Sequence, residues 1–209
     1  METATNVIEK VSLKGDRCDI TFKERYKVAN FSNEVAKKCE QIVHEDLKAA
    51  FRALRSFLIT ITEQPEAGLF NAANIDDEPD EEMEQEIMKY IVTGYTVGGS
   101  GESEGVTLIG QKILKSGQVL NLVAPFTKYC DDTNADAYPY AAELSIAITR
   151  CNYEVHEYLF NEKWGIKQQQ LDFETDVPEE AVLEEKPKKG RKSKKIKAIT
   201  PAVPFDATA

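Results

Sequence analysis

Near its C-terminus the chain carries a segment whose side chains could bind the phosphates of a nucleic acid. Within residues 186–197 there are eight basic residues and no acidic one: Lys186, Lys188, Lys189, Arg191, Lys192, Lys194, Lys195 and Lys197. Each phosphate that such a cation neutralises releases counterions, so binding would be non-specific and would weaken steeply with salt. Alternatively, this basic segment folds back on the acidic body, residues 1–185, which holds all but one of the 36 acidic residues.

A second short motif precedes the basic segment. Gln168, Leu171 and Phe173, within KQQQLDFE, fit the pattern Gln-x-x-Leu-x-Phe. This pattern resembles the peptide that bacterial replication proteins insert into the sliding clamp, where Leu and Phe fill an apolar pocket and the Gln amide hydrogen-bonds at its edge. The resemblance implies a sliding clamp as a partner. A strand or cap that closes the folded domain would have a similar sequence.

Residues suited to acid–base or nucleophilic catalysis are few. His44 and His156 each lie beside acidic residues, so either imidazole could be oriented by a carboxylate. No serine or cysteine lies at a spacing that ties it to them, and no His-Glu-x-x-His or P-loop pattern occurs. We therefore predict a protein that is not an enzyme, with two surface histidines, no catalytic residue and no cofactor.

The sequence also gives little support to metal or disulfide chemistry. Cys18, Cys39, Cys130 and Cys151 lie far apart without the close pairing of zinc ligands, and we predict free, buried thiols in a reducing cytosol. Residues 76–86 contain eight acids, but they lack the glycine and the alternating oxygen ligands of an EF-hand loop. We predict no metal site there and assign residues 64–86 to a solvated acidic loop that leads into a helix.

The composition is that of a soluble globular protein. The chain has 209 residues, of which 42% are hydrophobic and 30% charged, and its formal net charge is −10. It contains no run of 18 apolar residues and no basic–apolar leader at its start. These features predict a cytoplasmic protein with no membrane partner, and exclude collagen-like and disulfide-rich scaffolds.

Hydrophobic spacing predicts the elements of the first half. Alternation over residues 8–26, broken at Lys14–Arg17, predicts a β-hairpin. Apolar residues then recur at steps of three and four from Ser32, a suitable N-cap, to Ile61. This stripe predicts one helix of about 30 residues, whose β-branched last turns could instead form a strand.

The second half is predicted to continue the sheet and end in a helix. Residues 90–127 contain three strand candidates joined by two glycine-rich turns. The first turn, at 98–105, has two acids and no lysine and precedes a strand, so we predict a hairpin loop rather than a phosphate loop. A second apolar stripe begins at Leu144 and ends near Trp164–Gly165. The order ββ-α-βββ-α predicts the α+β class, with an antiparallel sheet and two long helices on one face.

The strand region GYTVGGSGESEGVTLIGQKILKSGQVLNLVAPFTK and the later EYLFNEKWGIKQQQLDF resemble a group of uncharacterised proteins carried by phages and mobile elements of gut bacteria. The resemblance covers roughly residues 8–173. It implies a protein of the bacterial host cytosol in a setting of DNA replication or recombination. The group has no established activity, so the resemblance assigns no role to any residue.

These features predict a single domain at 1–173, a disordered charged tail at 174–209, and a nucleic-acid-associated accessory protein that contacts DNA through the tail. If the sheet also contacts single strands, four aromatic residues could stack on bases, although such residues more often belong to the core: Tyr90, Tyr95, Phe126 and Tyr129. The alternative is a virion component or an inhibitor of a host protein that acts, and could form a homo-oligomer, through the long helix. An enzyme that holds Mg²⁺ in the acidic loops is a more distant alternative.

Overall fold

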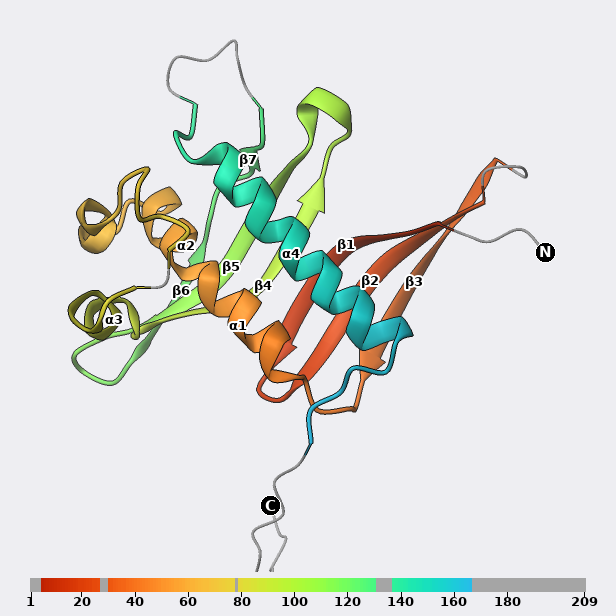
Figure 1. Cartoon of the computed structure of the whole chain (residues 1–209), viewed down its shortest axis with the longest axis horizontal. Helices are drawn as coiled ribbons and strands as arrows, with labels where there is room; N and C mark the ends of the chain where they lie inside the picture. Colours follow the sequence, from red (N-terminus) through yellow and green to blue (C-terminus); the bar gives the residue numbers. More distant parts are fainter. Residues whose placement is uncertain (1–4, 27–29, 78, 131–136, 167–209) are drawn as a thin grey trace, which may run out of the picture. The chain divides into compact units, whose positions relative to one another are not determined.

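Strands and helices alternate in blocks along the part of the chain that the computed structural model describes, residues 5–26, 30–77, 79–130 and 137–166 (Figure 1). The elements are, in order, β1 (Thr5–Lys14), β2 (Arg17–Tyr26), β3 (Phe31–Cys39), α1 (Glu45–Ala53), α2 (Arg55–Ile61), the 3-10 helix η1 (Pro65–Leu69), α3 (Glu81–Ile87), β4 (Tyr90–Gly98), the 3-10 helix η2 (Gly101–Ser103), β5 (Gly105–Ile113), β6 (Val119–Val123), β7 (Thr127–Lys128) and α4 (Ala141–Phe160).

The strands form one antiparallel sheet in the order β3-β2-β1-β4-β5-β6, and the short β7 also pairs with β5. The hairpin predicted at 8–26 is β1 and β2, and its turn uses Gly15 at a positive φ of 63°. The three strands predicted within 90–127 are β4, β5 and β6. The α+β class with an antiparallel sheet is therefore confirmed.

Two halves of the sheet meet at a short seam between β1 and β4. Only three residue pairs join these strands: Lys10 with Thr96, Val11 with Tyr95, and Ser12 with Gly94. The register shifts beside the seam in both strands, between Ile8 and Lys10 and between Val92 and Gly94. Gly94 lets the backbones approach closely, because a Cβ built on it would lie 2.6 Å from the carbonyl oxygen of Val11.

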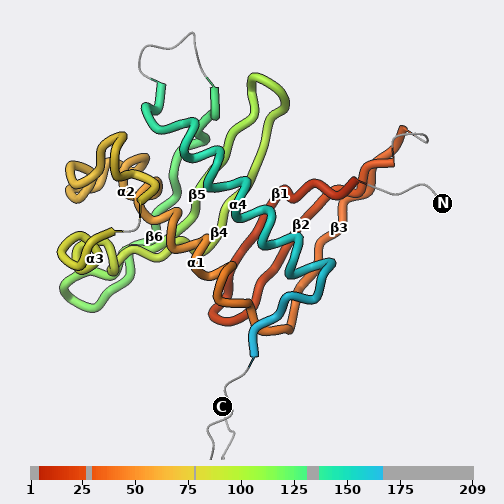
Figure 2. The backbone as a smooth tube through the Cα atoms, in the orientation of Figure 1, coloured from red at the N-terminus to blue at the C-terminus, as the bar shows by residue number. Residues whose placement is uncertain are grey.

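The helices α1, α2 and α4 pack on one face of the sheet, and the core lies between these two layers (Figure 2). The stripe predicted for the second helix is confirmed, because Leu159 is partly buried and the other members in α4 are at most 2% exposed: Leu144, Ile148, Cys151, Val155 and Tyr158. Phe57 and Leu58 of α2 and Tyr95 and Leu108 of the sheet complete this interior. Burial of these large side chains is the main stabilising contribution to the fold.

The prediction of one long helix from Ser32 to Ile61 is wrong in its first part. Residues 31–39 form β3, which pairs with β2 along its whole length, and helix formation starts only at Glu45. The N-cap is His44, whose Nδ1 accepts a hydrogen bond from the backbone of Asp46 at 3.2 Å. The helix is then interrupted at Leu54, giving the order βββ-α-α ahead of α3.

The apolar side chains of α1 and α2 are not available to bind a partner. The apolar residues of α1 and α2 that were predicted to form a stripe face the core rather than a partner, with Leu47, Leu54 and Phe57 each at most 1% exposed. Residues 32–61 therefore do not form the single long helix on which the alternative function rests. The β-branched end is helical up to Ile61. The hydroxyl of Thr60 donates a hydrogen bond to the carbonyl oxygen of Ser56 at 2.9 Å.

The predicted end of the second helix also needs correction. Helix α4 ends at Phe160, and the following chain crosses back to the segment before α1. Trp164 forms an isolated bridge with Val43, and the Gly165 amide donates to the Ile42 carbonyl at 2.7 Å. Gly165 is therefore not a helix stop. It permits a backbone crossing in which a Cβ would lie 2.6 Å from the Val43 oxygen.

Candidate functional site

Two of the predicted binding segments lie outside the described residues. The first is the basic segment, residues 186–197, and the second is the clamp-like peptide with Gln168, Leu171 and Phe173. The predicted tail at 174–209 also lies there. The structure therefore describes the body that would carry these segments.

The aromatic candidates for base stacking do not share one exposed surface. The rings of Tyr90 and Tyr95 are fully buried and point into the helix-covered face, so the prediction that they could stack on bases is wrong. Tyr95 donates its hydroxyl to Asn152 of α4 at 2.7 Å. Tyr129 is partly buried, and Phe126, at 48% exposed, is the one of the four whose ring a base could reach.

Both histidines have contacts that give them structural roles. His44 caps α1, and its Nδ1 accepts from the Asp46 amide, which ties that nitrogen to the cap. The His156 ring lies 4.8 Å from the ring of Phe160, one helical turn later on α4. The two imidazoles belong to different helices and different contacts, and the structure does not bring them together into a catalytic group.

Three of the four cysteines are buried, as predicted, and the fourth is exposed. Cys18 and Cys39 lie opposite each other in the β2–β3 register, and Cys151 lies in α4. Burial raises the pKa of Cys18 and of Cys151 to about 12, so both remain protonated thiols at neutral pH. The expectation of burial fails at Cys130, which follows β7 at the end of a described range.

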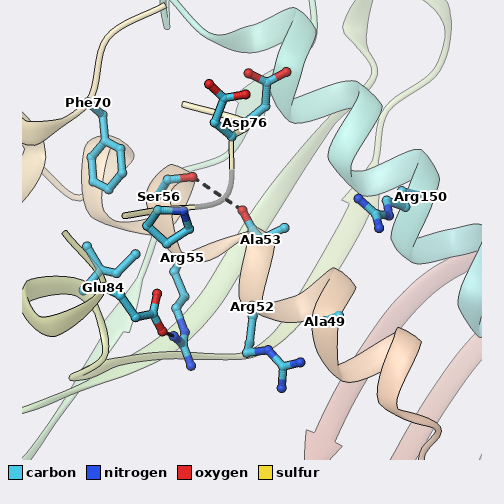
Figure 3. A pocket seen from close by; sticks show the side chains of 12 residues that line it. Ala49, Arg52, Ala53, Arg55, Ser56, Phe70, Asp76, Glu84 and Arg150 are labelled. Atoms are coloured by element: carbon cyan, nitrogen blue, oxygen red, sulfur yellow. Dashed lines mark hydrogen bonds and ion pairs between the residues drawn. The ribbon is translucent and has the colours of Figure 1, made fainter. Parts of the chain in front are cut away.

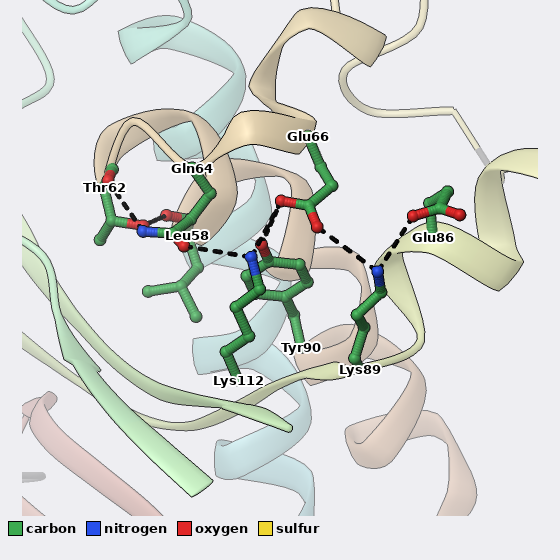
Figure 4. Close-up of polar contacts among 8 residues, drawn as sticks. All are labelled: Leu58, Thr62, Gln64, Glu66, Glu86, Lys89, Tyr90 and Lys112. Carbon is green, nitrogen blue, oxygen red and sulfur yellow. Dashed lines mark hydrogen bonds and ion pairs between the residues drawn. The ribbon is translucent and has the colours of Figure 1, made fainter. Parts of the chain in front are cut away.

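A cluster of polar side chains surrounds Glu66, in η1 (Figure 4). Its Oε2 accepts from the hydroxyl of Tyr90 at 2.5 Å and from Lys112 Nζ at 3.0 Å. Its Oε1 lies 3.5 Å from Lys89 Nζ, and Lys89 also pairs with Glu86. No local motif in the sequence indicates this cluster, because its members come from η1, α3, β4 and β5.

The environment of Glu66 keeps it ionised. Burial by itself would raise the pKa of Glu66, but the hydrogen bonds from Tyr90 and Lys112 outweigh it and lower the pKa to about 2. Lys112 is also held by Gln64 Oε1 at 3.4 Å and lies over the Tyr90 ring, 4.7 Å from its centroid. A carboxylate with such a low pKa is a poor proton acceptor near neutral pH, which argues against a role for Glu66 as a general base. Its hydrogen bonds to Tyr90 of β4 and Lys112 of β5 instead attach η1 to the sheet.

A cavity of about 320 Å³ lies between α1, α2, α4 and the loop before α3 (Figure 3). Three arginines line it, Arg52, Arg55 and Arg150, and Asp76 and Asp77 of the loop line it as well. The loop is held in place because Ser56 Oγ donates to the Ile75 carbonyl at 2.8 Å in the interior.

The arginines at this cavity differ in how they are engaged. Arg55 is largely buried and pairs with Glu84 of α3 at 3.1 Å, and Arg52 pairs with Glu45 at 2.7 Å. Arg150 projects from α4 (Figure 3). With cationic and anionic walls, the cavity is chemically suited to a ligand or peptide segment that carries both charges.

No family model, curated protein or solved structure matches this chain. Within the described ranges, no three His, Cys, Asp or Glu side chains are arranged to hold a metal ion. Of the helices in the same ranges, none has the length and apolar character to cross a membrane.

Proposed function

We propose that the protein is a nucleic-acid-associated accessory factor that is not an enzyme and acts in replication or recombination of a phage or mobile element. It contacts DNA non-specifically through the basic segment, residues 186–197. One observation carries the proposal, the concentration of eight cations in twelve residues of an otherwise acidic chain. Such a segment supplies the phosphate contacts on which non-specific affinity depends.

The charge of the described body supports nucleic-acid contact through the basic segment rather than through the body. The loop and first turn ahead of β4 present exposed acids to solvent, among them Asp76, Asp77, Glu81 and Glu82. These carboxylates repel a phosphate backbone, so the body favours contact at a cationic segment elsewhere in the chain. The body itself is then free to contact proteins.

We expect the basic segment to account for most of the affinity for nucleic acid. In the full chain, replacing its eight basic residues by Gln should weaken binding to labelled oligonucleotides at least tenfold at low salt. On duplex DNA, the slope of log affinity against log salt should fall by about 0.9 for each phosphate that the variant no longer neutralises. Fluorescence anisotropy over a salt series, with single and double strands of equal length, measures both quantities.

A matched control removes exposed cations from the sheet instead. Lys10, Lys37 and Lys38 are exposed on β1 and β3, and their joint replacement by Gln should leave affinity within about twofold. If the two variants weaken binding equally, or if the wild type does not bind at low salt, the proposal is wrong.

The peptide before the basic segment suggests a protein partner for the same factor. We expect a bacterial sliding clamp to bind the full chain, because Leu171 and Phe173 supply the apolar anchors of its binding peptide. The Leu171→Ala, Phe173→Ala double variant should bind at least tenfold more weakly in surface plasmon resonance. Asp172→Ala serves as the control at the intervening position, and equal affinities of the double variant and the wild type would refute clamp binding.

A further inference from the structure

The two edges of the sheet differ in how they are protected against pairing with another strand. The edge strand β3 carries exposed charges at Glu34, Lys37 and Lys38, which disfavour edge-to-edge pairing. The opposite edge strand, β6, has the sequence VLNLV without a charge or a proline. Its side chains are nevertheless open to solvent, with Val119 at 54%, Leu120 at 44% and Val123 at 66% exposed.

The hydrogen bonds on either side of β6 show which of its backbone groups point outward. Gln118 accepts from the Leu114 amide at 2.8 Å, and the Ala124 amide donates to Leu108 at 2.9 Å. Inward bonding alternates along an antiparallel strand, so Leu120 and Leu122 bond to β5. The N–H and C=O groups of Val119, Asn121 and Val123 are therefore directed to the edge of the sheet at which β6 pairs with no other described strand.

We propose that β6 pairs antiparallel with β6 of a second copy of this chain, about a two-fold axis at Asn121. The sequence VLNLV is a palindrome. Such pairing places Val119 opposite Val123 of the second copy, and Asn121 opposite its own equivalent. The outward groups then form about six backbone hydrogen bonds. Each valine thus lies opposite a valine and the asparagine opposite an asparagine. The edge is therefore self-complementary, as a two-fold interface requires.

The face of the sheet away from the helices continues the same pattern. In the register of β5 and β6, Ile109 lies beside Val123 and Ile113 beside Val119. Between them Gln111 donates its side-chain amide to Asn121 Oδ1 at 3.1 Å. In the pair, two apolar rows would flank one row of four amides, and a register slip would place the Asn121 amide against a valine. The amide row therefore specifies the register.

The size of this interface limits its strength. Five residues of edge strand with their neighbours bury less area than a standard stable interface, so we expect a Kd of about 10–100 µM. Both copies carry a net charge of −10, and their repulsion is screened by salt. Dimerisation should therefore tighten modestly with salt, which is the opposite of the dependence expected for nucleic acid, and it does not depend on nucleic-acid binding.

Sedimentation velocity of the full chain over a concentration series tests the proposal. The wild type should shift from monomer to dimer as its concentration passes through the expected Kd. Val123→Lys changes a side chain that is 66% exposed, so it should leave the fold intact, as checked by circular dichroism, and weaken the dimer at least tenfold. Ile146→Lys, at an equally exposed position on α4, is the matched control and should dimerise as the wild type does.

A cysteine scan tests the register independently. In a Cys130→Ser background, Asn121→Cys should form an intermolecular disulfide on copper-catalysed oxidation, because Cα atoms of a directly opposed pair lie about 5.5 Å apart. Val119→Cys should not, since two copies of residue 119 would be about 14 Å apart. A chain that stays monomeric, a dimer that survives Val123→Lys, or equal cross-linking at both positions would overturn the proposal.

Discussion

Replacing Glu66 by Gln is expected to lower the free energy of unfolding by about 3 kcal/mol at pH 7. The carboxylate is 13% exposed and faces Lys112, which is 14% exposed, so neither charge is well screened by water. An amide keeps the hydrogen bond to Tyr90 but leaves the ammonium of Lys112 without a counter-charge in a buried setting. Urea denaturation followed by circular dichroism measures the loss.

Glu66→Gln should also make the free energy of unfolding less dependent on pH in the acidic range. The pKa of Glu66 is about 2 in the folded chain against an ordinary 4.5, so its contribution is complete above pH 4.5. The contribution disappears as pH falls from 4.5 through 2, because both states then bind the proton. Wild type and variant should therefore converge towards pH 2.

Glu86→Gln is the matched control for this prediction. Glu86 pairs with Lys89, as Glu66 does, but it is 56% exposed. Its removal should cost less than about 0.5 kcal/mol, which is usual for a surface ion pair. If both variants lost equal stability, burial of Glu66 would not be the cause of the large effect.

Gly94→Ala is expected to destabilise the fold by about 3 kcal/mol, at the upper end of the range for overpacking. The new Cβ would lie 2.6 Å from the carbonyl oxygen of Val11, which is backbone and has no rotamer to adopt. The chain can relieve the clash only by separating β1 from β4, and this breaks a seam of just three residue pairs. Thermal and urea unfolding give the change in stability.

Hydrogen exchange identifies where the Gly94 variant weakens first. Amides of the seam, at Val11 and Tyr95, should exchange faster in the variant, while the β2–β3 and β5–β6 pairs lose less protection. Gly68→Ala is the control, since a Cβ there meets no atom within 4 Å, and it should change stability by less than about 0.5 kcal/mol. A Gly94 variant as stable as this control would contradict the importance of the seam.

Elements with a single period of hydrophobicity can be predicted from the sequence, and one with an ambiguous period cannot. The hairpin at 8–26 alternates over most of its length, and α4 repeats every three or four residues, so both elements are predicted correctly apart from the end of α4. Val35 and Cys39 are four apart, a spacing that fits a helix face and one face of a strand alike. Pairing with β2 decides in favour of the strand, and that pairing is not a local property.

Tyr90 and Tyr95 are both buried because a β-bulge in β4 changes the alternation of its side chains, and this bulge could not be predicted from the local sequence. Residues five apart on a regular strand point to opposite faces, so at most one of these rings should face the core. The bulge between Val92 and Gly94 shifts the register, and both rings face the helices, opposite Lys112 and Leu108. The cluster around Glu66 could not be predicted from the sequence either. It forms only when η1 packs against Tyr90 and Lys112, which are distant from Glu66 in the chain.

The seam between β1 and β4 also bears on the speed of folding. Each half of the sheet is built from neighbouring strands, whose hairpins can close in on the order of microseconds. The seam instead joins Val11 to Tyr95, with two strands and all of α1 to α3 between them in the chain. Its closure must overcome the entropy of that long loop for only three residue pairs. We therefore expect this step, rather than formation of the hairpins, to limit the rate at which the chain reaches its native topology.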